Sequence, residues 1–223
     1  MIFDIFRKKN PLPKYLYTEE ELNELEGYID SHFGSFDEVF HEMVSPDIHL
    51  DVLIIEPTDD EPYFKLITEG AGAYKQKAPK KYVDKKGHYS EFVILLPADW
   101  NIKSNESKWY WPIGELKKIA RVPGMYNTWL GPGHTLHANE EMESVDSSTK
   151  QNSFVLLKHT DSRGNSCEFR MKSGKYMNFY VIMPLYPEEL DFIFANGLDA
   201  LLDRIPDEDL PPIVNPNRRN YCV

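Results

Sequence analysis

The sequence predicts an α+β domain with a central, largely antiparallel sheet flanked by helices. Two observations lead to this prediction. Apolar residues recur at helical spacing in three separated segments, and runs rich in β-branched and aromatic residues lie between them in two groups of three. Several of these runs follow one another across turns too short for a parallel crossover, which needs a dozen residues or more. Hairpins combined with separated helices are typical of α+β domains rather than doubly wound sheets.

The first helix is predicted over residues 19–33. Thr18 followed by Glu21 forms a capping-box pattern, and the acidic first turn suits the positive end of a helix. Gly34 is able to end the helix, and the apolar residues within 36–40 predict a further helical turn. The apolar stripe consists of Leu22, Leu25 and Ile29.

Three strands follow the first helix. Residues 50–55 are dense in β-branched side chains and end before Pro57. Residues 63–68 follow a four-residue turn, so these two strands must be antiparallel. Residues 91–96 form a continuous apolar run closed by Pro97, which is typical of a strand buried on both faces.

The second helix is predicted to begin at the Trp109–Pro112 segment, because proline suits the first helical position. Ile113, Leu116 and Ala120 share one face, and Pro123-Gly124 stops the helix. The next segment, 127–135, is rich in turn residues and cannot form a regular helix.

The remaining elements are three strands and a helix. The strands are expected at 154–158, 168–172 and 177–186. A helix then runs from Pro187 to about Ile205, with Gly197 as a mild interruption that costs about 1 kcal/mol relative to alanine. The proline-rich tail is irregular. These elements predict an N-terminal arm at 1–18 and one domain at 19–223.

The composition restricts the possible partners. The net charge is −11, from 36 acidic and 25 basic residues. An acidic surface disfavours nucleic acid and anionic membranes and favours basic protein partners; the same charge also serves simple solubility. The N-terminus lacks the order of a signal peptide, no apolar run is long enough to span a membrane, and two cysteines give no disulfide framework. A cytoplasmic location is therefore expected.

The motifs that would indicate a cofactor or catalysis are incomplete. Gly70-Ala71-Gly72 follows a strand, but the third glycine of a dinucleotide fingerprint is missing and Pro79 comes too soon for the required helix. His134 and His137 lie beside several glutamates without the spacing of a zinc motif. No G-x-S-x-G motif occurs. We therefore expect no cofactor, no metal and no enzymatic activity.

Six aromatic residues are concentrated between positions 100 and 129. Such a group can anchor an interface or pack the core around one helix. We expect most of them in the core. The six are Trp100, Trp109, Tyr110, Trp111, Tyr126 and Trp129.

Nine segments in order along the chain resemble bacterial Suppressor of Fused domains, over about residues 30 to 220. None is decisive alone, but nine in the same order are hard to reach by chance. They are His49–Val52, Thr68–Gly72, Glu91–Pro97 with Trp100, Trp109–Ile113, Ala120-Arg121, Asn127–Thr135, Met177–Tyr180, Pro184–Leu190 and Leu201–Arg204.

The resemblance implies a single domain with a central mixed sheet and no enzymatic activity. The animal relative clamps an extended peptide of a transcription factor, and the bacterial members are mostly regarded as immunity proteins of polymorphic toxin systems. In the animal relative a Gly-Asp-His segment takes part in peptide capture. This chain keeps the histidine as His134 but carries Gly133 at the aspartate position, which argues against the same peptide specificity.

The resemblance thus predicts a monomeric binding protein that neutralises a cognate toxin or binds another protein ligand, with a basic nuclease as the favoured toxin. The alternatives are an enzyme that uses His134 with a carboxylate such as Glu69 or Asp51, or a generic scaffold. The partner-binding residues predicted on this basis are Trp129, Gly131, Gly133, His134, Thr135 and Glu69.

Overall fold

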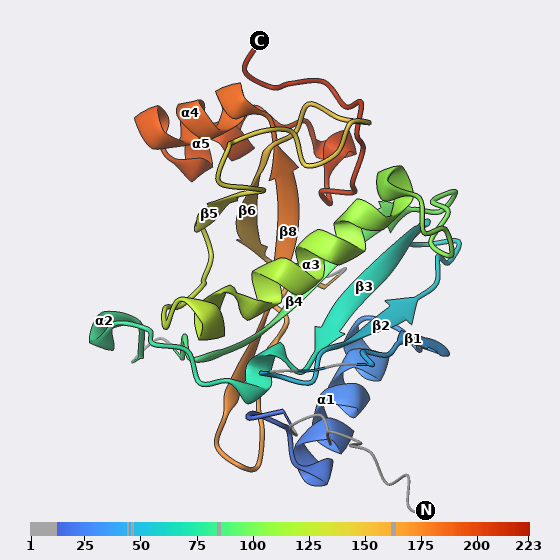
Figure 1. Ribbon diagram of the computed structural model, residues 1–223, viewed down its shortest axis with the longest axis vertical. Helices are drawn as coiled ribbons and strands as arrows, with labels where there is room; N and C mark the ends of the chain where they lie inside the picture. The colour runs from blue at the N-terminus through green and yellow to red at the C-terminus, as the bar shows by residue number, and fades with distance from the viewer. Residues whose placement is uncertain (1–12, 44, 46, 84–85, 162–163) are drawn as a thin grey trace, which may run out of the picture.

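One mixed sheet organises the domain. The computed structural model describes residues 13–43, 45, 47–83, 86–161 and 164–223. Within these residues the strand order is β1-β2-β3-β4-β8-β6-β5, and β7 pairs with β8 (Figure 1). Only the β4–β8 pair is parallel among the strand pairs of the described chain. The strands are β1 (Glu38–Phe40), β2 (Asp51–Ile55), β3 (Tyr63–Glu69), β4 (Tyr89–Pro97), β5 (Thr135–His137), β6 (Ser153–Lys158), β7 (Glu168–Arg170) and β8 (Tyr176–Leu185). The predicted α+β class and the largely antiparallel sheet are confirmed.

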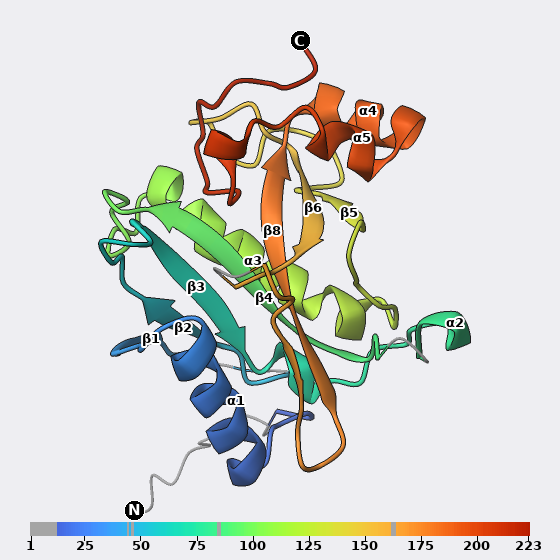
Figure 2. The same cartoon turned by 180° about the vertical axis from the view of Figure 1, so that it is seen from behind.

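Helices cover both faces of this sheet. Apolar side chains alternate along β2, so that Val52 and Ile54 pack in one cluster with α3, whereas Leu53 and Ile55 pack in another with α1. Figures 1 and 2 show α3 and α1 on opposite faces. Helices α4 and α5 pack on β6 and β8 in a third cluster. The helices are α1 (Glu19–His32), α2 (Lys80–Val83), α3 (Ser107–Met125), α4 (Pro187–Asn196) and α5 (Leu198–Leu202), with 3-10 turns η1 (Ala71–Ala73) and η2 (Asp207–Asp209).

The capping box predicted for the first helix is present. The Glu21 amide donates to Thr18 Oγ1 at 3.2 Å, and the Thr18 amide donates to Glu21 Oε2 at 3.2 Å. Lys175 also donates to Glu21 Oε2, at 2.8 Å, and ties the hairpin of β7 and β8 to the start of α1. Here a local sequence signal and a tertiary contact stabilise the same helix end.

Three sequence predictions were wrong in detail. Residues 38–40 form the edge strand β1, paired with β2, instead of another helical turn, because Gly34 leaves the helix with φ +119°. Helix α3 runs from Ser107 to Met125, so Pro112 and Pro123, predicted to begin and to stop it, both lie inside it; the burial of both prolines outweighs their low helix propensity. Gly197, with φ +91°, ends α4 and separates it from α5 instead of merely interrupting one helix.

The Gly70–Gly72 turn binds a carboxylate of the protein itself. Glu91 is fully buried in β4. Its side chain accepts hydrogen bonds from the amides of Gly70, Ala71 and Gly72 at 3.1, 3.3 and 2.9 Å. The Tyr17 hydroxyl donates at 2.6 Å and the Thr68 hydroxyl also donates. The backbone amides of this turn thus bind a buried side chain of the protein, which gives the glycine motif a structural role.

Two close approaches explain the glycines of this turn. A Cβ at Gly70 would lie 1.8 Å from the carbonyl oxygen of His49, and Gly70 has φ +128°. A Cβ at Gly72 would lie 2.2 Å from the Tyr17 hydroxyl. Only glycine fits both positions without moving backbone or the Glu91 cluster.

Candidate functional site

The predicted partner-binding loop connects the end of α3 to the edge strand β5. Asn127, with φ +50°, leaves the helix, and the Thr128 carbonyl accepts from the Lys77 amide at 3.0 Å. The buried Gln76 side chain accepts from the Leu130 amide at 2.6 Å. The loop is therefore held by specific hydrogen bonds to the 76–77 segment, and it presents its polar residues from a fixed backbone.

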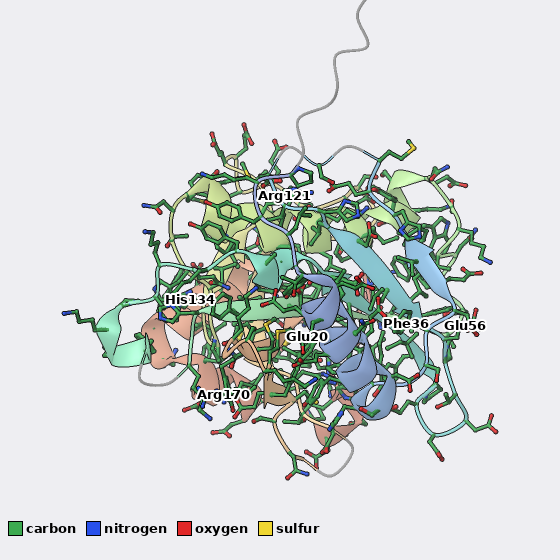
Figure 3. All side chains as sticks on the ribbon, turned by 90° about the horizontal axis from the view of Figure 1, so that it is seen from below. Glu20, Phe36, Glu56, Arg121, His134 and Arg170 are labelled. Carbon is green, nitrogen blue, oxygen red and sulfur yellow. The ribbon has the colours of Figure 1, made fainter. Side chains whose placement is uncertain are left out.

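Trp129, Gly131 and His134 pack together in this loop, whereas Gly133 faces Leu198 of α5. The Trp129 and His134 rings meet edge to face, with centroids 4.3 Å apart, and Tyr82 of α2 packs on Trp129 at 4.5 Å. A Cβ at Gly131 would lie 2.7 Å from the indole ring of Trp129, so this position needs glycine. Trp129, Gly131 and His134 thus meet beside α2 (Figure 3), whereas the role of all the predicted residues in partner binding stays a prediction.

His134 is a half-buried loop residue. Burial lowers its pKa below the ordinary value, and a hydrogen bond with the Trp129 backbone opposes this effect. Its backbone is anchored at both ends, because its amide donates to the Gly131 carbonyl at 3.1 Å and its carbonyl accepts from the Leu156 amide at 2.9 Å. The carboxylate of Asp51 binds His41 and His49. These contacts indicate that His134 holds the loop in place through its backbone hydrogen bonds.

β5 is an edge strand with one side open. The Leu156 amide donates to the His134 carbonyl, and the Ala138 amide donates to the Asn152 carbonyl. In an antiparallel ladder these inward bonds alternate, so residues 134, 136 and 138 face β6. The amides and carbonyls of Thr135 and His137 therefore point away from β6, towards the open edge of the sheet. Such an edge is a template for pairing with another strand.

An apolar groove lies beside this edge. It has a volume of about 610 Å³ and is lined by the second half of α3 and by residues 137–140 and 142. Met125 is 66% exposed, Tyr126 67% and Met142 59%. Three large apolar side chains in one groove exceed the scattered exposure that is normal for a protein surface. Flexible methionine side chains are common on surfaces that adapt to a partner.

The rim of this groove is acidic. Glu140, Glu141 and Glu143 are exposed on the segment that follows β5. Two of the three cations that line the groove are already paired, because Lys118 contacts Glu115 at 2.7 Å and Arg121 contacts Asp47 at 3.3 Å as well as Glu42; Lys117 is the third. The negative charge of these three exposed glutamates favours a basic partner at the groove.

Glu69 lies in a different environment from the loop. It ends β3 opposite Asp51 of β2. Burial raises its pKa to about 8, and the charges of Glu26, Glu91 and Asp51 add to this shift. Its Oε1 atom is buried and has no hydrogen-bond partner within the described structure. Its predicted role in partner binding stays a prediction.

The raised pKa of Glu69 gives an expected pH dependence of stability. The folded state holds the proton more tightly than the unfolded state, so the contribution of Glu69 is complete below about pH 4.5 and is lost as the pH rises through about 8. The shift corresponds to at most about 5 kcal/mol, and solvent screening of a partly exposed carboxyl reduces it, so we expect Glu69→Gln to be more stable than the wild type by about 1–2 kcal/mol at pH 9 and nearly equal to it at pH 4.5. Urea unfolding of both proteins at the two pH values measures this difference. An equal difference at both pH values would contradict it.

The sequence carries no pattern that predicts this groove. Met125 and Tyr126 end a helix, and Met142 lies in an irregular segment, so no periodicity joins them. The six aromatic residues between positions 100 and 129 differ in burial. Trp100 and Trp111 are core residues, Trp109 and Trp129 are half-buried, and Tyr110 and Tyr126 are exposed. The concentration of aromatics was the one available signal, and Tyr126 is its member in the groove.

No cluster of three or more His, Cys, Asp or Glu side chains with the arrangement of a metal site occurs among the described residues. In the same part of the chain, no helix has the length and apolar character needed to cross a membrane.

Comparisons with known proteins place this fold. The model of the Suppressor of fused protein (SUFU) family matches residues 46–219. An uncharacterized protein, UU111, of Ureaplasma parvum serovar 3 is 26% identical over 211 residues, which cover 93% of this chain and 98% of the relative.

Three solved structures share the fold at low sequence identity. A putative SUFU homolog from Neisseria gonorrhoeae FA 1090 has a TM-score of 0.61 at 14% identity, covering 90% of this chain and 96% of the other. A Sufu-Fu complex structure has a TM-score of 0.62 at 11% identity, covering 90% and 91%. Drosophila Suppressor of Fused has a TM-score of 0.54 at 10% identity, covering 90% of this chain and 50% of the other. With the family model matching most of its length, the chain belongs to the Suppressor of fused (SUFU) family, which supports a protein-interaction domain.

Proposed function

We propose that this chain captures another protein at the open edge of β5 and the adjoining groove, and that the partner is a cognate toxin that it neutralises. The observation that carries the proposal is the position of β5. Its outward amides and carbonyls at Thr135 and His137 lie next to a groove with three exposed apolar side chains. Together they offer both elements of peptide capture, hydrogen bonds to a main chain and a surface for side chains.

Strand addition fits this geometry. An extended partner segment would pair with Thr135 and His137, and its alternate side chains would point towards the groove, since strand side chains alternate between faces. The His134 loop fixes the start of β5 through its bonds to Leu156. A pre-formed edge reduces the ordering needed on binding.

The charge of the chain supports a basic toxin. The net charge is −11, and the acids that follow β5 extend this charge to the groove rim. A nuclease toxin carries a basic surface for nucleic acid, which an acidic inhibitor can cover with fast, salt-dependent association. The bacterial resemblance supports the same class of partner.

The first test is genetic and biochemical. We expect the product of the adjacent gene to be toxic when expressed alone, harmless when co-expressed with this chain, and co-purified with it. A harmless neighbour that does not bind would contradict the toxin assignment while leaving capture of another protein intact.

Substitutions at the edge test the binding mode. Thr135→Pro removes an outward amide and leaves the ladder to β6 intact, so we expect the Kd for the partner to rise about tenfold or more. Met125→Asp puts a charge in the groove, and we expect a rise of about thirtyfold. Titration calorimetry measures both.

Two matched variants serve as controls. Thr135→Val keeps the amide and the side-chain shape, and Leu210→Asp adds the same charge at a position that is 42% exposed in the C-terminal tail. Both should bind like the wild type. Unchanged binding in Thr135→Pro and Met125→Asp would rule out this surface.

A further inference from the structure

The C-terminal tail encloses a second cavity, away from β5. It has a volume of about 500 Å³ and lies between residues 208–218, the start of α3 and the end of β8. The tail is fixed there by hydrogen bonds from Thr149 Oγ1 to the Pro216 carbonyl at 2.8 Å and from the Val214 amide to the Leu95 carbonyl at 2.9 Å. The walls are therefore part of the folded structure.

A buried polar group without a partner lines this cavity. Gln151 is 1% exposed, and its Nε2 donates to the Asn215 carbonyl at 3.2 Å. This bond orients the amide, so that Oε1 remains as an acceptor, and Oε1 has no partner within the described structure. A buried acceptor without a partner is costly, and a ligand with N–H donors would satisfy it.

The other lining groups favour a cation with an apolar body. Trp100 and Trp109 line the cavity, and the Trp100 indole N–H is already donated to the Trp109 carbonyl at 2.9 Å. Indole faces attract cations, and Lys108 Nζ already lies over the Trp109 ring, 5.5 Å from its centroid. The lining acids are Asp99, Glu208 and Asp209; Arg219 lies 3.8 Å from Glu208 and 3.0 Å from Asp209, so among the described residues Asp99 is the exposed lining acid without an ion pair.

The cations of this cavity are already neutralised. Arg218 binds Glu189, and Lys108 lies 3.1 Å from Glu106. The charge left for a ligand is therefore negative, and an anion would meet no free cation among the lining residues that the structure describes.

From this arrangement we infer a binding site for an organic cation, an ammonium, amidinium or guanidinium group on an apolar body, with Gln151 Oε1 as the acceptor and Trp100 and Trp109 as the apolar walls. This site is independent of the proposed capture at β5.

Benzamidine is a suitable probe, because it joins N–H donors and positive charge to a flat apolar ring. The chain has four tryptophans, so its indole N–H signals are easily followed in ¹H–¹⁵N spectra. We expect the Trp100 and Trp109 signals to shift with a Kd on the order of 1 mM, as suits so small a ligand, while Trp129 stays unchanged. Acetyl-arginine amide, added separately, tells whether a basic side chain binds as well as a free small cation.

Matched ligands and variants decide the result. Benzoate, with the same shape and opposite charge, and neutral benzyl alcohol should bind at least about tenfold more weakly. Gln151→Leu should weaken benzamidine binding about tenfold, and Asp99→Asn, at an exposed position, should weaken it severalfold; Glu19→Gln on α1 should not change it. The inference is overturned if benzamidine shifts no indole signal up to about 10 mM, if benzoate binds equally well, or if neither Gln151→Leu nor Asp99→Asn changes the Kd.

Discussion

Glu91→Leu is expected to unfold the domain. The Glu91 carboxylate accepts bonds from Tyr17, Thr68 and the three amides of residues 70–72. Leucine has a similar volume but leaves all of these donors buried without an acceptor. Each such group costs about 1–3 kcal/mol, so the sum reaches the whole stability of a typical domain, about 5–15 kcal/mol. Circular dichroism and urea unfolding report the loss.

Tyr17→Phe is the matched control for Glu91→Leu. It removes one donor and keeps the ring and the carboxylate, and we expect a loss of only about 1 kcal/mol. Burial raises the pKa of Glu91, and its hydrogen bonds from Thr68 and Tyr17 lower it. A folded Glu91→Leu protein with a stability within about 1 kcal/mol of the wild type would show that these bonds do not organise the turn.

Arg218→Met is expected to lower the free energy of unfolding by about 3–5 kcal/mol. Glu189 is 0% exposed, and Arg218 binds both of its carboxylate oxygens, with Nη1 2.6 Å from Oε1. Arg218 also donates to the Pro184 carbonyl at 2.7 Å. Removing the cation leaves a buried carboxylate unpaired, which is the costly case for a buried ion pair.

The neighbouring Arg219 supplies the control for this pair. Its contact with Asp209 is exposed, so Arg219→Met should cost about 0–1 kcal/mol. The double variant Arg218→Met, Glu189→Leu should recover part of the loss, because no charge stays unpaired. The recovery is partial, since Glu189 also accepts from the amides of Tyr186 and Tyr221. Equal effects of Arg218→Met and Arg219→Met would contradict this assignment.

Much of the fold was predictable because its signals are local. The capping box at Thr18 and Glu21 lies within four residues, and the buried strands β2, β3 and β4 are apolar runs closed by turn residues. The early start of α3 was not predictable from propensity, since it depends on the burial of Trp111 and Pro112 against the sheet. The edge strands β1 and β5 have only three residues each, too few for a period to be recognised.

The candidate site was predictable only in its loop. Glycine, proline and histidine within 127–135 mark an unusual backbone, and the structure places these residues beside the edge strand. The groove depends on tertiary structure, because it joins the end of α3 to Met142. The sequence also does not tell which glutamate side chain is buried inside the fold. Glu91 is fully buried and accepts several hydrogen bonds, whereas Glu69 is partly buried and has a raised pKa.

The central claim is that a partner strand pairs with the open side of β5, and amide hydrogen exchange in the partner complex tests it most directly. Thr135 and His137 should exchange markedly more slowly once the partner is bound, whereas Leu136, already paired with Phe154 of β6, should change little. Protection confined to another surface, with Thr135 and His137 exchanging as in the free protein, would contradict the claim.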